Sequence, residues 1–311
     1  MKSYHELFAE KPLRIVTRQS KLAMAQTDIV TAQLPQIPVE VTAMSTSGDE
    51  ILDRPLVEIG GKGVFIKALE HMMVQGQADA AVHSFKDMET VLAPDTSLCA
   101  VLPRADWRDA LVGPYKSIES LPEGAVIGTS SVRRSAILRH SRPDLKVELL
   151  RGNVQRRLEK LDQGAFDAII LAMAGLTRLG LEERGHPLDD KVMMPSASQG
   201  VIAVQIATSD VNRAEAMRAV FAPLHCKKTE IVTMAERSLL AHLDGSCRTP
   251  IGAMGTLQDD GMVRLRAVVL SADGAQKFEA EATASQEQAA ALGIQVADML
   301  LSQCGGRSFL A

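Results

Sequence analysis

Short apolar segments alternate with helical segments from residue 13 to residue 206 of this chain. The first three are a strand over residues 13–17, a helix over 20–35 with apolar residues at helical spacing, and a strand over 39–44. A strand, a helix and a second strand connected in this way form a right-handed crossover between parallel strands. The pattern therefore predicts an α/β fold built on parallel sheets.

The same pattern occurs a second time, which predicts two α/β lobes. In the first lobe an apolar strand over 78–83 precedes Ser84-Phe85-Lys86-Asp87. The second lobe begins near Pro103, and an apolar run over 201–206 is predicted to return the chain to the first lobe. Two lobes imply a cleft, and α/β sheets bind ligands at the carboxyl ends of their strands. In the second lobe we expect strands over 125–128, 146–150 and 167–173 and helices over 132–140 and 154–163.

The sequence after about Pro223 predicts a small α+β domain. A long helix over 230–243 precedes three stretches of alternating polarity, which are joined by Asp-Gly turns, a strong hairpin signal. A last helix is expected over 286–302. The predicted fold class is therefore α/β, with two α/β lobes and a small third α+β domain carrying an antiparallel three-stranded sheet. The strands of that sheet are expected over 251–257, 262–271 and 276–282, and the domain boundaries at 1–102 plus 202–222, 103–201 and 223–311.

The composition narrows the classes of partner. The formal net charge is −4 and the pI is near 6.0, so we expect no general attraction to nucleic acid or to an anionic membrane. Aromatic residues make up only 3% of the chain, which disfavours stacking on nucleic-acid bases. The sequence shows neither a signal peptide nor an apolar run of the roughly 18–20 residues that cross a membrane. Its four cysteines lack C-x-x-C spacing, so we expect a cytoplasmic protein with no disulfide framework and no metal requirement.

Cys247 is a candidate attachment point for a covalently bound group. It lies in Asp244-Gly245-Ser246-Cys247-Arg248-Thr249-Pro250-Ile251-Gly252, where the glycines and the proline predict a loop. A thiol on a loop can be reached by an electrophile, and the adjacent Arg248 favours the thiolate. The alternative is that Cys247 is a small buried hydrophobic residue, which is the commoner role of a lone cysteine.

Arginine residues gather at predicted turns in both lobes. Arg133 and Arg134 follow Ser130-Ser131 at the start of a predicted helix, where backbone N–H groups and hydroxyls also favour an anion. Because a guanidinium group pairs bidentately with a carboxylate, the arginines together predict a site for a polyanion. Each arginine taken alone could instead be a solvated surface residue, as we expect for Arg156. The other candidates are Arg18, Arg151, Arg157 and Arg178.

Lys86 and Asp87 close a predicted strand and place an ammonium group beside a carboxylate at the ligand-binding edge. The carboxylate could hold a cationic group or pass a proton, and the alternative is a plain surface ion pair.

The segment Gly60-Gly61-Lys62-Gly63 lacks the spacing of a nucleotide-binding loop, and its glycines fit better as hinges of a mobile flap. Phe65 could offer a ring face to a flat substrate or belong to the core. His83 is expected to pack at the strand end.

Together these segments resemble the porphobilinogen deaminases, also called hydroxymethylbilane synthases, over about residues 13–301. Any one of the motifs is weak, whereas the set is highly specific. The motifs are Thr17-Arg18-Gln19-Ser20, Gly60-Gly61-Lys62-Gly63, Val82-His83-Ser84-Phe85-Lys86-Asp87, Gly128-Thr129-Ser130-Ser131-Val132-Arg133-Arg134, Leu150-Arg151-Gly152-Asn153-Val154 and Gly245-Ser246-Cys247.

The resemblance implies a dipyrromethane cofactor joined to Cys247 through a thioether, with porphobilinogen as the small-molecule substrate. Four porphobilinogen molecules would be added one at a time, each with loss of ammonia, before hydrolysis releases the linear tetrapyrrole. The resemblance also implies two lobes like those of periplasmic binding proteins and a monomeric protein. By position, Asp87 and Lys86 would be catalytic, Arg133, Arg134, Ser131, Lys86 and Ser84 would hold the cofactor, and Arg18, Ser20, Arg151, Arg157, Arg178 and Phe65 would bind substrate.

The sequence departs from the family pattern at two places. Met88-Glu89 follows Lys86-Asp87 where the family usually has Val-Pro, so we expect a less rigid turn, and Ser246 replaces a common glycine. One alternative is therefore a family member with impaired turnover. Another is a non-catalytic anion-binding or sensor protein with the same two lobes, although that function leaves Cys247 without a role and no secretion signal supports it.

Overall fold

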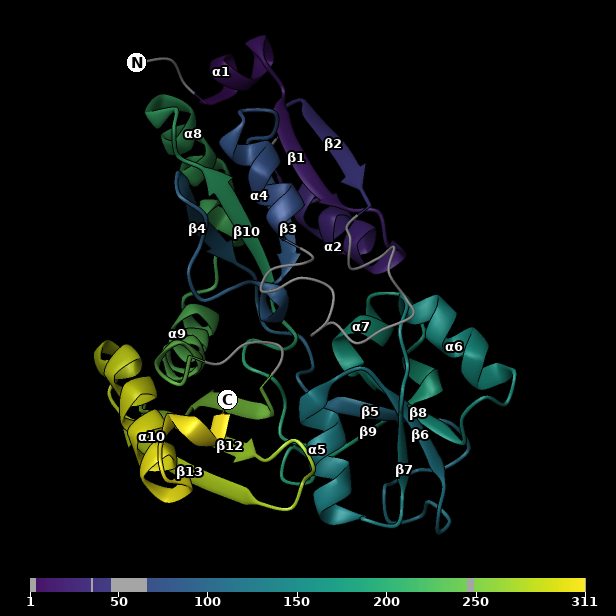
Figure 1. The fold of residues 1–311 in the computed structure, drawn as a ribbon. Coiled ribbons are helices and arrows are strands. Elements are labelled where there is room, and N and C mark those ends of the chain that lie inside the picture. Colours follow the sequence, from purple (N-terminus) through teal and green to yellow (C-terminus); the bar gives the residue numbers. More distant parts are fainter. Residues whose placement is uncertain (1–3, 35, 46–65, 245–248, 311) are drawn as a thin grey trace.

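The computed structural model describes residues 4–34, 36–45, 66–244 and 249–310. These residues form two five-stranded sheets and one three-stranded sheet, each accompanied by helices (Figure 1). The predicted fold class, with two α/β lobes and a third α+β domain, is confirmed. None of the helices within these ranges is long and apolar enough to cross a membrane.

The sheet of the first lobe has the strand order β2-β1-β3-β10-β4. Strand β1 pairs in parallel with β2 and β3, whereas β10 is antiparallel to β3 and β4. The predicted return of the chain to the first lobe is therefore confirmed, but the prediction of parallel sheets is incomplete, because a strand that enters from the other lobe runs in the opposite direction. The strands are β1 (Leu13–Arg18), β2 (Val39–Met44), β3 (Ala80–Ser84), β4 (Thr96–Val101) and β10 (Ile202–Ala207), and the helices are α1 (Tyr4–Glu10), α2 (Lys21–Thr31), α4 (Lys67–Val74) and α8 (Val211–Phe221).

The second lobe repeats this plan with the strand order β7-β6-β8-β5-β9. Here β6 pairs in parallel with β7 and β8, and β5 is the antiparallel strand. The chain passes between the lobes twice, through residues 102–108 before β5 and through residues 188–201 before β10. The strands are β5 (Asp109–Val112), β6 (Val126–Thr129), β7 (Lys146–Leu149), β8 (Ala168–Ala172) and β9 (Gly185–Pro187), and the helices are α5 (Val132–Ser141), α6 (Val154–Asp162) and α7 (Met173–Thr177).

The third domain is an antiparallel sheet covered by two long helices. Helices α9 and α10 pack so closely that a Cβ atom on Gly293 would lie 2.3 Å from the carbonyl oxygen of Ala235. Only glycine fits at this contact. The strands are β11 (Ile251–Leu257), β12 (Val263–Leu270) and β13 (Lys277–Ala284), and the helices are α9 (Lys227–His242) and α10 (Ala289–Cys304).

The third domain shares a hydrophobic core with the second lobe. Met254 and Val268 of the third domain belong to the same buried cluster as Ile137 of α5. The β12–β13 turn also contacts the end of α5, where His140 Nδ1 lies 2.9 Å from the carbonyl oxygen of Gly274. A buried apolar core and polar contacts thus join these two parts of the molecule. The domain boundaries given above stay a prediction.

Candidate functional site

The turn that carries Lys86 and Asp87 follows β3 directly. It is a single 3-10 turn, η2 (Phe85–Asp87), in which the Phe85 backbone N donates to the carbonyl of Val201 at 2.9 Å. The side chains of Lys86 and Asp87 are partly exposed. Ser84, the last residue of β3, is hydrogen-bonded through Oγ to the side-chain amide of Gln26 at 2.8 Å. The pair therefore lies at the carboxyl end of a strand inside the sheet, where the sequence placed it.

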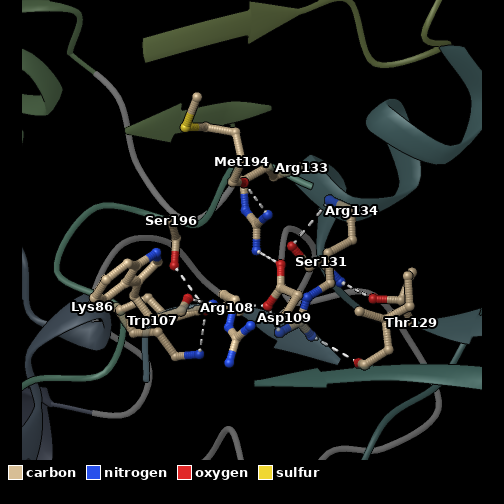
Figure 2. Close-up of polar contacts among 12 residues, drawn as sticks. Lys86, Trp107, Arg108, Asp109, Thr129, Ser131, Arg133, Arg134, Met194 and Ser196 are labelled. Atoms are coloured by element: carbon tan, nitrogen blue, oxygen red, sulfur yellow. Dashed lines mark hydrogen bonds and ion pairs between the residues drawn. The ribbon is translucent and has the colours of Figure 1, made fainter. Parts of the chain in front are cut away.

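The start of helix α5 places Arg133 and Arg134 in the interior. Ser131 is the N-cap residue, and its Oγ accepts a hydrogen bond from the backbone N of Arg134. Both arginines reach the carboxylate of Asp109, the first residue of β5, which is 0% exposed. Asp109 Oδ2 lies 2.8 Å from Arg133 Nη2, and Asp109 Oδ1 lies 2.7 Å from Arg134 Nη2 (Figure 2).

The two guanidinium groups use only part of their donors within the protein. Arg133 Nη1 donates to the carbonyl of Met194, and Arg134 Nη1 donates to the carbonyl of Ile170 at 2.9 Å. The Nε atoms of both arginines are buried and have no hydrogen-bond acceptor among the described residues. Buried donors are nearly always paired, so an added carboxylate fits the chemistry of this pair.

Gln199 connects the arginine pair with Lys86. Its Nε2 donates to Asp109 Oδ1 at 2.8 Å and to the carbonyl of Trp107 at 2.7 Å, and its Oε1 accepts from Lys86 Nζ at 3.1 Å. Ser196 Oγ donates to the same Oε1 at 3.3 Å. Figure 2 shows Lys86, Asp109, Arg133 and Arg134 around this junction. A lysine of the first lobe thus shares one polar network with an arginine pair of the second.

Burial and charge work against each other in this network. Burial alone would raise the pKa of Asp109, but Arg133 and Arg134 hold it well below its usual range. Burial, together with the Arg134 charge, lowers the pKa of Lys86 to about 8, although Asp87 and Asp109 act in the opposite direction. Three cations therefore surround one buried anion, and the network keeps an excess of positive charge that favours an anionic ligand.

Several of the other predicted residues act on Arg157. Its pKa is lowered to about 10, by burial first and by the charges of Arg134, Arg151 and Arg18, whereas Asp87 acts in the opposite direction. Arg157 Nε donates to the carbonyl of Gly152 at 2.8 Å. Arg157 therefore feels the charges of Arg18 and Asp87 of the first lobe as well as those of Arg134 and Arg151 of the second.

The remaining predicted residues have individual environments. Arg178 Nη2 donates to the carbonyl of Gly200 at 2.7 Å, which places this guanidinium against the second crossing between the lobes. Ser20 caps helix α2, with its Oγ accepting from the backbone N of Ala23. His83 is buried, and burial lowers its pKa to about 4, so a neutral, packed imidazole agrees with the sequence interpretation. Cys247 and Phe65, together with Gly60-Gly61-Lys62-Gly63, lie outside the described residues.

Two functional residues, Asp109 and Gln199, were missed by the sequence interpretation. Asp109 begins a four-residue strand, and Gln199 lies in the predicted linker, so neither belongs to a motif. One feature of the sequence could have indicated them: two adjacent arginines that are buried need a negatively charged partner.

A pocket of about 500 Å³ on the second lobe, lined in part by Tyr115, Phe166 and His186, contains none of the site residues. Among the described residues, no group of three or more His, Cys, Asp or Glu could hold a metal ion.

Several solved structures are similar to this chain, at low sequence identity and with TM-scores below 0.5. A putative methionine-binding lipoprotein from Bacillus subtilis is 11% identical, with 71% of this chain and 93% of that chain covered and a TM-score of 0.40. YhfZ from Shigella flexneri is 20% identical, with 67% and 83% covered and a TM-score of 0.37. An amino acid ABC transporter substrate-binding protein from Streptococcus pneumoniae, bound to L-arginine, is 15% identical, with 76% and 96% covered and a TM-score of 0.38. These scores support no functional conclusion.

Two family models match most of the sequence. The model for the porphobilinogen deaminase dipyromethane cofactor binding domain matches residues 13–215. The model for the porphobilinogen deaminase C-terminal domain matches residues 231–302. The first match alone spans more than half of the chain and contains every predicted site residue except Cys247. The chain therefore belongs to the porphobilinogen deaminase family.

Proposed function

We propose that this protein is a hydroxymethylbilane synthase, a transferase of tetrapyrrole biosynthesis. In this proposal four porphobilinogen molecules are joined head to tail on a dipyrromethane primer, each with loss of ammonia, and hydrolysis then releases hydroxymethylbilane. The protein would act as a monomer in the cytoplasm. The observation that carries the proposal is the meeting of Lys86, Arg133 and Arg134 in one network, with Asp87 beside it.

The arginine pair is suited to the carboxylates of the primer. Each pyrrole ring carries an acetate and a propionate, so a primer of two rings brings four carboxylates into the protein. The buried Nε donors of Arg133 and Arg134 and the ammonium of Lys86 can bind them. Ser131 Oγ accepts a bond from the helix backbone, so its hydroxyl hydrogen stays available to donate, and Ser84 is placed at the end of β3.

Cys247 is proposed to hold the primer through a thioether bond. When bound, the dipyrromethane would supply the free pyrrole carbon to which the first substrate is joined, and each later substrate would join the end of the growing chain. The residues of the chain bind and orient that substrate. Loss of ammonia leaves an electron-poor, positively charged substrate pyrrole, which an adjacent carboxylate stabilises. Asp87 is the proposed carboxylate, and Lys86 is its proposed partner in catalysis.

A second group of arginines is proposed to hold the substrate. Arg18, Arg151 and Asp87 all influence the charge of Arg157, and the three arginines are proposed to offer guanidinium groups to the acetate and propionate of porphobilinogen. Because burial lowers the pKa of Arg157 only to about 10, it stays charged at neutral pH. Arg178, Ser20 and Phe65 complete the proposed substrate-binding set.

The proposal is tested by the stoichiometry of turnover. Purified protein is incubated with porphobilinogen, and substrate loss, ammonia release and hydroxymethylbilane formation are measured together. We expect four substrate molecules consumed and four ammonia molecules released for each product. The Cys247→Ala variant should form no product, whereas Cys304→Ala, a matched change at another cysteine, should behave like the wild type. Binding of porphobilinogen without ammonia release would instead favour the non-catalytic anion-binding alternative.

A further inference from the structure

Arg237 of helix α9, in the third domain, contacts the turn that carries Lys86 and Asp87. Its Nη1 donates to the carbonyl of Met88 at 3.2 Å, and its Nη2 donates to the carbonyl of Glu89 at 2.5 Å. Its guanidinium carbon also lies 4.4 Å from the centre of the Phe85 ring. One side chain thus contacts residues on both sides of Lys86 and Asp87.

These contacts are made in a buried setting, where they count most. Phe85 and Met88 are 2% and 3% exposed and belong to an apolar cluster of the first lobe that includes Val101. Hydrogen bonds and cation–π contacts gain strength when water is excluded. Burial lowers the pKa of Arg237 to about 10, against the charges of Glu89 and Glu236, so its guanidinium stays protonated at neutral pH.

The turn has two anchors that come from different domains. On the first-lobe side, the Phe85 backbone N donates to the carbonyl of Val201. On the third-domain side, Arg237 binds the carbonyls of the two residues that follow Asp87. Lys86 and Asp87 lie between these anchors. A shift of α9 would therefore act on the backbone on both sides of Lys86 and Asp87.

Helix α9 also connects the turn with other parts of the site. Glu236, the residue before Arg237, pairs with Arg104 of the first crossing between the lobes and accepts a hydrogen bond from the backbone N of Ser198 in the second crossing. The helix ends at His242, five positions before Cys247 in the sequence. Helix α9 thus contacts the η2 turn and both crossings, and Figure 1 shows it between the first lobe and the sheet of the third domain.

The contact falls on Met88-Glu89, where the sequence departs from the family pattern. Both residues accept hydrogen bonds from Arg237 through their carbonyls, and the Glu89 charge acts on Arg237. A side chain of helix α9 thus holds a turn that contains no proline to fix its backbone.

We propose that Arg237 is a positioning residue, which holds the η2 turn so that Asp87 and Lys86 keep their places relative to the second lobe. This inference rests on the proposed function, in which Asp87 acts on the substrate. A residue that acts only on stability would change the number of folded, primer-loaded molecules. A positioning residue instead changes the rate of each of those molecules.

The test compares Arg237→Gln and Arg237→Lys with the wild-type holoenzyme. Intact-protein mass spectrometry counts the molecules that carry the primer, and kcat is expressed per loaded molecule. Because a displacement of about 1 Å can cost about 100-fold in rate, we expect kcat of Arg237→Gln to fall by about 10- to 100-fold, with KM for porphobilinogen changed by less than about threefold. Arg237→Lys keeps the charge over Phe85 and one donor group, and it should recover part of the loss. Phe85→Leu, which removes the ring, should show a smaller loss of the same kind.

Hydrogen–deuterium exchange of the peptide containing residues 84–90 supplies a readout that does not depend on activity. We expect faster exchange there in Arg237→Gln, with other lobe peptides unchanged. The matched control is Arg142→Gln, which removes an arginine that donates to the carbonyls of Ile118 and Leu121 outside the site and should leave both readouts as in the wild type. Unchanged kcat per loaded molecule, or unchanged exchange at 84–90, overturns the inference. A wild-type protein that releases no ammonia overturns the proposed function instead, and the exchange result then decides the positioning role alone.

Discussion

Lys86 Nζ lies 3.1 Å from Gln199 Oε1, and this contact joins the proposed catalytic turn to the arginine pair of the second lobe. Gln199 links Lys86 to the arginine pair, because its Nε2 donates to Asp109 and Asp109 binds both Arg133 and Arg134. Lys86, which is proposed to act in catalysis, and Arg133 and Arg134, which are proposed to hold the primer, therefore belong to one hydrogen-bonded network. A change in one of its charges is expected to affect the others.

Asp87→Asn is predicted to lose most of the activity and to keep the primer. The substitution preserves the shape of the side chain and removes the negative charge that the proposal places beside the positively charged substrate pyrrole. Loss of one preorganised electrostatic contact of this kind costs about 100- to 1000-fold in kcat. Intact mass and steady-state kinetics measure the two effects separately. Asp162→Asn, at a surface ion pair, is the control. Kinetics within a few-fold of the wild type would rule out the role given to Asp87.

The activity is predicted to fall as the pH rises through about 8. Burial lowers the pKa of Lys86 to about 8, so its ammonium is fully present below that pH and is lost above it. If the ammonium binds a carboxylate, kcat/KM should follow the same decline. Lys86→Arg keeps a charge at all accessible pH values, so its alkaline limb should move up by at least about one pH unit. Identical alkaline limbs in the two proteins would contradict this assignment.

Glu236→Gln is predicted to destabilise the fold strongly. Glu236 is 0% exposed, and it binds Arg104 Nη1 at 2.6 Å and the backbone N atoms of Ser198 and Gly255 at 2.6 and 2.7 Å. Breaking a buried ion pair leaves an uncompensated charge and costs about 3–5 kcal/mol. Urea denaturation measures the free energy of unfolding. Asp162→Asn breaks the exposed pair with Arg184, with side chains 56% and 41% exposed, and should cost less than about 1 kcal/mol. Equal effects of the two changes would show that Glu236 has no special structural role.

The contribution of Asp79 to stability is predicted to be complete above about pH 4 and to fade as the pH falls toward about 2. Burial would raise its pKa, but hydrogen bonds from Arg213 and Arg14 lower it to about 2 from the ordinary 3.8. Because the folded-state pKa is the lower one, the stabilisation is complete above the unfolded-state pKa and is lost as the pH falls toward about 2. With solvent screening at the partly exposed Arg14, the contribution is about 1–2 kcal/mol. The difference in free energy of unfolding between wild type and Asp79→Asn should shrink from pH 6 to pH 3. A difference that is constant over this range would contradict the linkage.

Long apolar or alternating segments were predictable from the sequence, because the burial of their side chains determines which positions are apolar. The strands of the third domain and strand β2 agree with their predicted ranges to within two residues at each end. Strands β4 and β5 and helix α8 were not predicted. Strand β5 has only four residues and begins with an aspartate, and β4 has no regular alternation of buried and exposed positions. Neither strand therefore shows the apolar periodicity that predicts a strand from sequence.

The candidate site was predictable only in part, for a related reason. Lys86, Arg133 and Arg134 occupy strand and helix ends, which local sequence locates well. Asp109 becomes a functional group only because tertiary structure buries it between two arginines that follow it by more than twenty positions. Arg237 acts on a turn about 150 positions earlier in the chain. Neither separation leaves a local pattern in the sequence.

The covalent primer is the central claim, and peptide mapping by mass spectrometry of the freshly purified protein tests it most directly. We predict that the intact mass exceeds the sequence mass by two pyrrole units, that the extra mass maps to the peptide containing Cys247, and that Cys247→Ala lacks it. Wild-type protein with an unmodified Cys247 that still converts porphobilinogen to hydroxymethylbilane would contradict the account.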